Sequence, residues 1–169
     1  GRDSPPHSAL KSVEALMRSM KNTEDKKHGS RQGEWIATIM GRYYAMDRKK
    51  DWIKTEAAYH AMVMGQGKTA DSPQAAITEA YNRNETDEFV PPYVLKHHGK
   101  PIAKIADNDA VIFFNLRSDR ARQLAKPFVQ KNFNDGNAGS FKRHKVLKNL
   151  LFVAMTDFGP DLDSILTAY

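Results

Sequence analysis

An α/β fold is predicted for this chain, as a three-layer α/β/α arrangement with a mixed sheet. Short apolar, β-prone runs alternate along the sequence with segments of helical periodicity, which is typical of this class. Two strands flank a short turn that contains two histidines and a glycine, so one pair is antiparallel and the sheet is mixed. The 169 residues, 40% of them hydrophobic, are enough for one domain with a hydrophobic core.

Periodicity and turn residues define the elements of the first half. Apolar residues recur at helical spacing after Pro5 and Pro6, and the apolar run WIATIM reads as a buried strand. Ser72 and Pro73 fit the N-cap and first position of a later helix. The elements expected here are, in order, a helix over 10–20, a solvent-exposed loop at 21–33, a strand at 35–40, and helices at 51–64 and 73–81.

The second half is predicted to contain a hairpin, two buried strands and one helix. His97 and His98 precede a turn glycine and are expected at an exposed hairpin turn rather than as metal ligands. Asp107 and Asp109 are interpreted as turn formers. The elements expected here are a hairpin from 93 to 105, a strand at 111–116, a helix capped by Ser118, a loop at 132–140 and a strand at 150–155.

Composition limits the classes of function. Cysteine is absent, which excludes disulfides, thiolate metal sites and cysteine nucleophiles. No apolar run reaches the ~20 residues of a membrane helix, and we expect a cytoplasmic protein. The net charge of +6 points to an anionic partner, which is a nucleic acid, a membrane surface or a phosphorylated metabolite.

Arginines follow two of the predicted strands directly. Arg42 and Arg48 follow the strand at 35–40, and Arg117 and Arg120 follow the strand at 111–116. Ligands of α/β folds bind beyond the carboxyl ends of strands, and the guanidinium fork matches phosphate and carboxylate oxygens. We expect the four arginines to converge on one cleft, because both strands should belong to one sheet. The alternative is that each arginine pairs with a neighbouring aspartate at the surface.

Four strings of residues resemble, in order, the motifs of the cofactor-independent (2,3-bisphosphoglycerate-independent) phosphoglycerate mutase family, and 151–158 extends the resemblance. Together they are far more specific than any one of them alone. The strings are GRDSPP at 1–6, GRYYAMDR at 41–48, TDEFVPP at 86–92 and DNDAVIFFNLRSDRARQ at 107–123.

The resemblance implies a part of a glycolytic and gluconeogenic isomerase that interconverts 3-phosphoglycerate and 2-phosphoglycerate. Such enzymes have a phosphatase-like domain, with two divalent ions (often manganese) and a reactive serine, and a second domain that binds the substrate. This chain resembles only the second, so residues 1–155 are expected to form one substrate-binding domain and 156–169 a tail or linker. We expect it to bind no metal or cofactor itself, to be inactive alone, to be a monomer and to have the phosphatase-like domain as its partner.

The resemblance also implies which residues bind the substrate. Asp3 would contact the glycerate hydroxyls and is a candidate for proton transfer, whereas the arginines would hold the carboxylate and phosphate. Because Arg2 and Asp3 lie at the beginning of the chain, they are expected to be displaced from a working arrangement. The implied substrate-binding residues are Arg2, Asp3, Arg42, Arg48, Arg117 and Arg120.

Two other kinds of function remain as alternatives. A basic nucleic-acid-binding domain is suggested by the net charge and by Tyr43 and Tyr44, whose rings lie among arginines and could stack on bases. The other alternative is a stand-alone interaction module. Contacts to many phosphates would give binding a steep salt dependence, which a pocket for a small metabolite would not show.

Overall fold

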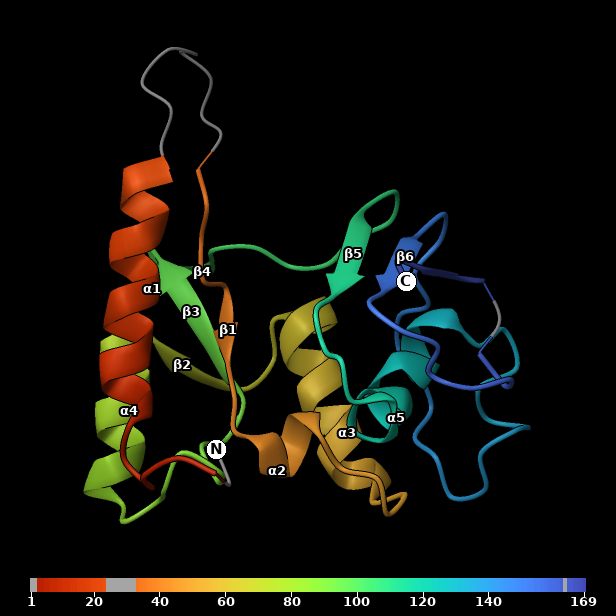
Figure 1. The fold of residues 1–169 in the computed structure, drawn as a ribbon, viewed down its shortest axis with the longest axis horizontal. Helices are drawn as coiled ribbons and strands as arrows, with labels where there is room; N and C mark the ends of the chain where they lie inside the picture. Colours follow the sequence, from red (N-terminus) through yellow and green to blue (C-terminus); the bar gives the residue numbers. More distant parts are fainter. Residues whose placement is uncertain (1–2, 24–32, 163) are drawn as a thin grey trace.

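The computed structural model describes residues 3–23, 33–162 and 164–169. The α/β class is confirmed, since helices accompany both parallel and antiparallel strand pairs (Figure 1). Arg2 and most of the predicted loop at 21–33 lie outside the described residues. None of the described helices is long and apolar enough to cross a membrane.

The strands form two sheets rather than the single sheet expected from the sequence. The chain leaves the first sheet after β4 (Lys100–Pro101), and residues 102–109 connect it to the second sheet (Figure 1). There, β5 (Ala110–Phe113) pairs with β6 (Leu151–Ala154) and with no other described strand. The first sheet contains β1 (Thr38–Ile39), β2 (Lys68–Ala70), β3 (Tyr93–His97) and β4 (Lys100–Pro101). The second contains β5 (Ala110–Phe113), β6 (Leu151–Ala154) and β7 (Ile165–Thr167).

β3 is the central strand of the first sheet. It is antiparallel to β1 and β4 and parallel to β2, with Val94 opposite both Thr38 and Thr69. Helices α1 (Ala9–Thr23) and α4 (Pro73–Asn82) lie side by side next to this sheet (Figure 1). Fully buried alanines of α4 pack with Tyr93 and Leu95 of β3, so this sheet and α4 share one core cluster.

The helices predicted for the first half are present. The Ser72 Oγ accepts a hydrogen bond from the Ala75 N–H at 3.1 Å, which confirms it as the N-cap of α4. The predicted helix at 51–64 is α3 (Trp52–Tyr59) followed by a π-helical turn, η1 (His60–Met64). Gly65 ends it in the left-handed conformation, with φ 67°.

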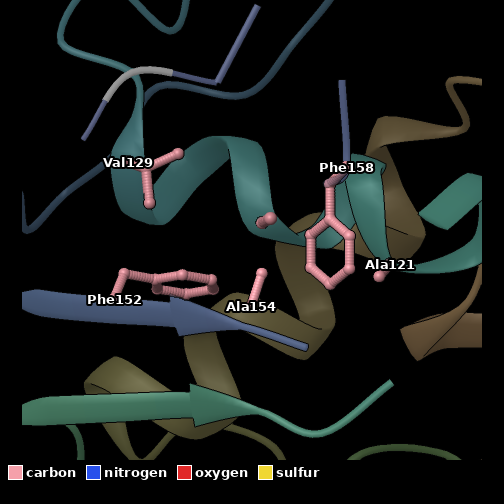
Figure 2. Close-up of a cluster of buried hydrophobic side chains, with 6 residues drawn as sticks. Ala121, Val129, Phe152, Ala154 and Phe158 are labelled. Atoms are coloured by element: carbon pink, nitrogen blue, oxygen red, sulfur yellow. The ribbon is translucent and has the colours of Figure 1, made fainter. Parts of the chain in front are cut away.

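The second sheet is parallel throughout and packs on α5 (Ser118–Val129). Figure 2 shows Phe152 and Ala154 of β6 facing Ala121 and Val129 of α5, and all four are buried. The prediction that Ser118 caps this helix is wrong, because Arg117 occupies the N-cap position. The Arg117 N–H donates instead to the Asn115 Oδ1 at 2.9 Å, a local turn that starts the helix one residue earlier.

Two strands predicted to be buried are only partly covered. Trp35 is 66% exposed, and the strand of its run is shortened to the two residues of β1. In β5 and just after it, side chains alternate, and Ile112 and Phe114 are 67% and 82% exposed. A run that is apolar on both faces predicts a parallel strand covered on both sides. Within the described ranges, α5 covers one face of this sheet and the other face meets solvent.

The hairpin and the predicted turns are confirmed. β3 and β4 pair around an exposed turn in which His98 and Gly99 have φ values of 49° and 74°. The Asp109 carboxylate accepts a hydrogen bond from the Ala106 N–H at 2.7 Å, as a turn former does.

Part of the predicted tail at 156–169 packs into the fold, since Phe158 is buried beside α5 and β7 pairs with β6. The division at residue 155 stays a prediction.

A buried carboxylate fixes the beginning of α1. The side chain of Asp87 accepts hydrogen bonds from the Ser8 and Ala9 N–H groups, at 2.9 and 3.0 Å, and from the Tyr81 hydroxyl. Burial raises the pKa of Asp87, but the hydrogen bonds donated by Tyr81, Ser8 and Ala9 outweigh burial and hold it below its ordinary value. The segment that follows Asp3 is therefore anchored from Ser8 onwards.

We predict that Asp87→Asn lowers the free energy of unfolding by about 1–3 kcal/mol at neutral pH, because it weakens charge-assisted bonds to α1. The pKa of Asp87 is lower in the folded than in the unfolded chain, so this contribution is complete above about pH 5 and is lost as the pH falls through the folded pKa. Urea unfolding of both proteins between pH 3 and 7 measures it. Asp135→Asn, at an exposed loop position, is the control, and an equal loss there would contradict the prediction.

Candidate anion-binding site

A close backbone approach positions the first arginine. The Gly41 N–H donates to the Val90 carbonyl oxygen at 2.7 Å, and the Tyr43 N–H donates to the Glu88 carbonyl oxygen at 3.0 Å. A Cβ atom on Gly41 would lie 2.2 Å from that Glu88 oxygen, so no larger residue fits there. α2 (Arg42–Ala45) begins directly after this glycine, and Arg42 is its first residue.

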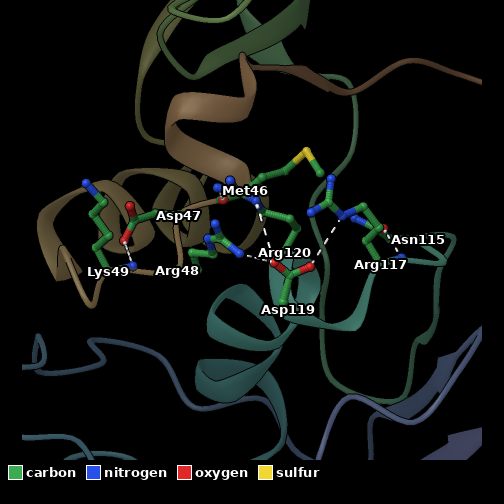
Figure 3. A network of polar contacts seen from close by, with 8 residues as sticks. All are labelled: Met46, Asp47, Arg48, Lys49, Asn115, Arg117, Asp119 and Arg120. Carbon is green, nitrogen blue, oxygen red and sulfur yellow. Dashed lines mark hydrogen bonds and ion pairs between the residues drawn. The ribbon is translucent and has the colours of Figure 1, made fainter. Parts of the chain in front are cut away.

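The other three arginines surround Asp119, in the first turn of α5 (Figure 3). Its carboxylate lies 2.5 Å from the Arg48 guanidinium, 3.4 Å from that of Arg117 and 3.9 Å from that of Arg120. The Arg120 guanidinium also donates to the Met46 carbonyl oxygen at 3.1 Å. Residues from two distant segments therefore meet at one point.

The charges of all four arginines act on one another. Burial lowers the pKa of Arg120, and the positive charges of Arg48, Arg42 and Arg117 lower it further. Printed contacts aside, no closer link is needed for three of the four arginines that the sequence placed after two strands: Arg48, Arg117 and Arg120 meet at Asp119, although those strands belong to different sheets. Arg42 is connected to them only through the effect of its charge on Arg120.

The cluster holds more hydrogen-bond donors than its one carboxylate satisfies. The Nε of Arg120 is buried and has no hydrogen-bond partner among the described residues. Over the same residues, the Arg42 guanidinium forms neither an ion pair nor a hydrogen bond. A buried donor left unpaired is unfavourable, and an anion that entered between these groups would satisfy it.

Asp119 was not singled out in the sequence, although it lies between two of the arginines in the string RSDR. Partial burial raises the pKa of Asp119, but the Arg48 and Arg117 guanidinium groups hold it below its ordinary value. Arg48 and Asp119 form an ion pair, and their side chains are 50% and 41% exposed. This pair therefore also fits the alternative that each arginine pairs with a neighbouring aspartate at the surface. The sequence signal for Asp119 was the alternation of positive and negative side chains directly after the predicted strand at 111–116.

The structure does not join the first motif to this cluster. Arg2 lies outside the described residues. Asp3 lies in an exposed turn before α1, and the described contacts give it no hydrogen bond or ion pair with any of the four arginines. Its predicted place in the same site stays a prediction.

Other candidate residues have structural partners. The Lys54 ammonium group lies 3.8 Å from the ring centroid of Tyr43, and this ring also packs edge-on against Tyr44 and at a tilt against Phe89. The nucleic-acid interpretation therefore finds no support here. In the part of the chain that the structure describes, no group of three or more His, Asp or Glu side chains is arranged to hold a metal ion.

The fold and the cluster define a class: an α/β domain that gathers arginines from two distant segments around one carboxylate. A family model described as the N-terminus of the BPG-independent phosphoglycerate mutase (PGAM) matches residues 1–160, and the chain belongs to this family. The family expected from the four sequence motifs is thereby confirmed.

Individual relatives agree with this assignment. The chain is 45% identical over its whole length to the 2,3-bisphosphoglycerate-independent phosphoglycerate mutase of Clostridium novyi, and 48% identical over 96% of its length to enzyme 1 of Methanosarcina barkeri. It is also similar to the crystal structure of Leishmania mexicana phosphoglycerate mutase at low cobalt concentration, with a TM-score of 0.82 and 28% identity over 92% of this chain. The chain spans 30%, 29% and 28% of these three proteins, respectively.

We predict that Gly41→Ala lowers the free energy of unfolding by about 1–3 kcal/mol, since its Cβ would overlap the Glu88 carbonyl oxygen and α2 would have to move. Gly136→Ala is the matched control, because the nearest atom to its Cβ is 3.7 Å away. Urea unfolding of the three proteins measures the difference. Equal stability of Gly41→Ala and the unmodified chain would contradict the close approach.

Proposed function

We propose that the four arginines bind the phosphate and carboxylate of a phosphoglycerate, and that the chain supplies this binding to a mutase that interconverts 3-phosphoglycerate and 2-phosphoglycerate in glycolysis and gluconeogenesis. The observation that carries the proposal is the buried Nε of Arg120, which has no hydrogen-bond partner among the described residues, within a cluster of three guanidinium groups around the Asp119 carboxylate. Membership of the BPG-independent phosphoglycerate mutase family supports the choice of substrate.

The chemistry of the substrate fits the number of arginines. A phosphoglycerate carries a phosphate and a carboxylate, and each binds a guanidinium fork through two oxygens. Asp119 competes for the same donors, so the incoming anion replaces its carboxylate at Arg48 and Arg117. Arg42 and the Nε of Arg120 gain partners in the same step, which favours binding of the larger anion over the internal ion pair.

In this proposal, the chain binds and orients the substrate and does not itself transfer the phosphoryl group. Arg2 would add a further contact to the substrate. Asp3 would accept the proton of the glycerate hydroxyl that attacks the phosphoryl group, because such a hydroxyl needs an acceptor within hydrogen-bond reach. The described residues contain no group of three or more His, Asp or Glu side chains that could hold the divalent ions implied by the family resemblance, and we propose that these ions bind in the phosphatase-like part of the mutase.

The proposed partner is the phosphatase-like part of a larger mutase polypeptide. The relatives are more than three times as long as this chain, which supports a role as one part of a longer enzyme. A monomeric state and a cytoplasmic location stay predictions.

We predict that the chain binds 3-phosphoglycerate weakly, and that Arg48→Ala lowers its affinity by about 10- to 100-fold, the scale of a lost charge-assisted hydrogen bond. Arg48 is the suitable position, because its side chain is 50% exposed and its removal leaves the core intact. Arg18→Ala is the control for net charge, since Arg18 lies on the exposed face of α1. Calorimetric titration at constant ionic strength measures the three affinities.

The same titrations decide between the proposal and its alternatives. If Arg48→Ala and Arg18→Ala bind 3-phosphoglycerate with equal affinity, only the net charge of the chain affects binding, and the proposed site is overturned. Binding of single-stranded oligonucleotides with a steep salt dependence and an increase with length would favour the nucleic-acid interpretation instead.

A second prediction concerns turnover. The chain alone should show no mutase activity with or without added manganese, because the family resemblance assigns the reactive serine and the metal ions to the phosphatase-like domain, which this chain does not resemble. Asp3→Ala should change the affinity of the chain for 3-phosphoglycerate little, whereas the corresponding change in a full-length mutase should lower turnover by about 100-fold or more. Coupled assays of both proteins measure this. Metal-dependent turnover by the chain alone would show that the chemistry has been misplaced.

A further inference from the structure

The loop at 46–51, which carries Arg48, is fixed to α5 at both ends. At its beginning, the Met46 carbonyl oxygen accepts the hydrogen bond from Arg120 at 3.1 Å. Near its end, the Lys50 N–H donates to the Gln123 Oε1 at 2.8 Å. Arg120 and Gln123 are three residues apart on α5 and therefore lie on the same face of the helix.

A buried amide connects the loop to the interior. The Gln123 side chain is 5% exposed, and its Nε2 donates to the Asp47 carboxylate at 2.9 Å and to the Thr55 hydroxyl at 2.8 Å. The same Asp47 oxygen accepts the N–H groups of Lys49 and Asp51, at 3.1 and 3.0 Å. Asp47 thus closes the loop on itself, and Gln123 joins the closed loop to α5.

One residue of this loop has a backbone conformation that is rarely adopted. Lys50 has a φ of 60°, in the left-handed region that a residue with a side chain rarely adopts. Such a conformation persists where surrounding contacts determine it, and the bond from the Lys50 N–H to Gln123 is one of these contacts. Loss of Gln123 would remove this contact and the bond to Asp47, which together hold the loop that carries Arg48.

We infer that Gln123 is a positioning residue for the anion-binding site: through Asp47 and Lys50 it holds Arg48 beside Arg117 and Arg120. The inference rests on the proposed function, since it assigns Gln123 a part in binding phosphoglycerate. Gln123 does not touch the anion. It acts only by fixing the loop that carries one of the ligands.

A double-mutant cycle tests the inference with 3-phosphoglycerate as the ligand. Gln123→Met keeps the length of the side chain and removes its three hydrogen bonds, and we expect it to weaken binding by about 10-fold. In an Arg48→Ala background, the same substitution should weaken binding no further, because the residue it positions is gone. Gln130→Met is the matched control: Gln130 is a buried glutamine at the end of α5 that bonds to Asn137 and Asp161 instead. It should lower stability and leave the affinity unchanged.

Amide hydrogen exchange gives a second readout that does not depend on the ligand. Gln123→Met should increase exchange at Lys50 and Asp51 with little change in the α4 amides, since only the loop at 46–51 is released. If Gln123→Met does not fold, Asp47→Asn removes the charge from the same junction, and we expect the same coupling to Arg48.

The outcomes separate this inference from the proposed function. If Arg48→Ala does not weaken binding, the proposed function fails and the inference fails with it. If Arg48→Ala weakens binding but Gln123→Met does not, the proposed function stands and the inference is overturned. Additive losses in the cycle would also overturn it, because they would show that Gln123 affects binding through the general stability of the chain.

Discussion

The packing of α3 against α5 is the interaction on which the arrangement depends. The described strands of the two sheets form no hydrogen-bonded pair with each other, so helices have to hold them in a fixed relation. A core cluster that contains Trp52 and Tyr59 of α3 and Phe133 and Phe141 beyond α5 provides this connection. The Tyr59 hydroxyl adds a bond to the Lys145 carbonyl oxygen at 2.7 Å, and Gln123 adds one to Thr55. This interface brings the segments that carry the arginines close to each other, and the bonds of Arg120 and Gln123 to the loop at 46–51 add to it.

Four like charges at one site are unfavourable in the absence of a ligand, and the fold reduces this cost in two ways. Asp119 supplies one opposite charge inside the cluster, where its own pKa is held below its ordinary value. The exposed positions of Arg48 and Arg117 let water screen their repulsion, whereas Arg120 is largely buried and carries the pKa shift. The remaining imbalance of charge favours an anion with more than one charged group, which agrees with the proposed binding of a phosphate and a nearby carboxylate.

Features that depend on neighbours in the sequence were predictable, and features that depend on distant partners were not. Ser72 caps α4 and the turn at His98 and Gly99 forms as expected, because their geometry is decided within three or four residues. The division into two sheets could not be inferred, since it depends on which distant strand takes each edge of β3. Asp87 gave no local sign that it anchors α1, because its partners Ser8 and Ala9 lie about 80 residues away.

The convergence of the arginines was predicted, but for a reason that the structure corrects. The expectation assumed one sheet, in which the carboxyl ends of neighbouring strands share an edge. The two strands lie in separate sheets, and what aligns their ends is the face of α5 that carries both Arg120 and Gln123. The string SDRARQ places Arg120 and Gln123 three residues apart, so both fall on one face of the predicted helix. Arg120 bonds to Met46 and Gln123 bonds to Lys50 and Asp47, so this one helical face joins two segments that are about 70 residues apart in the sequence.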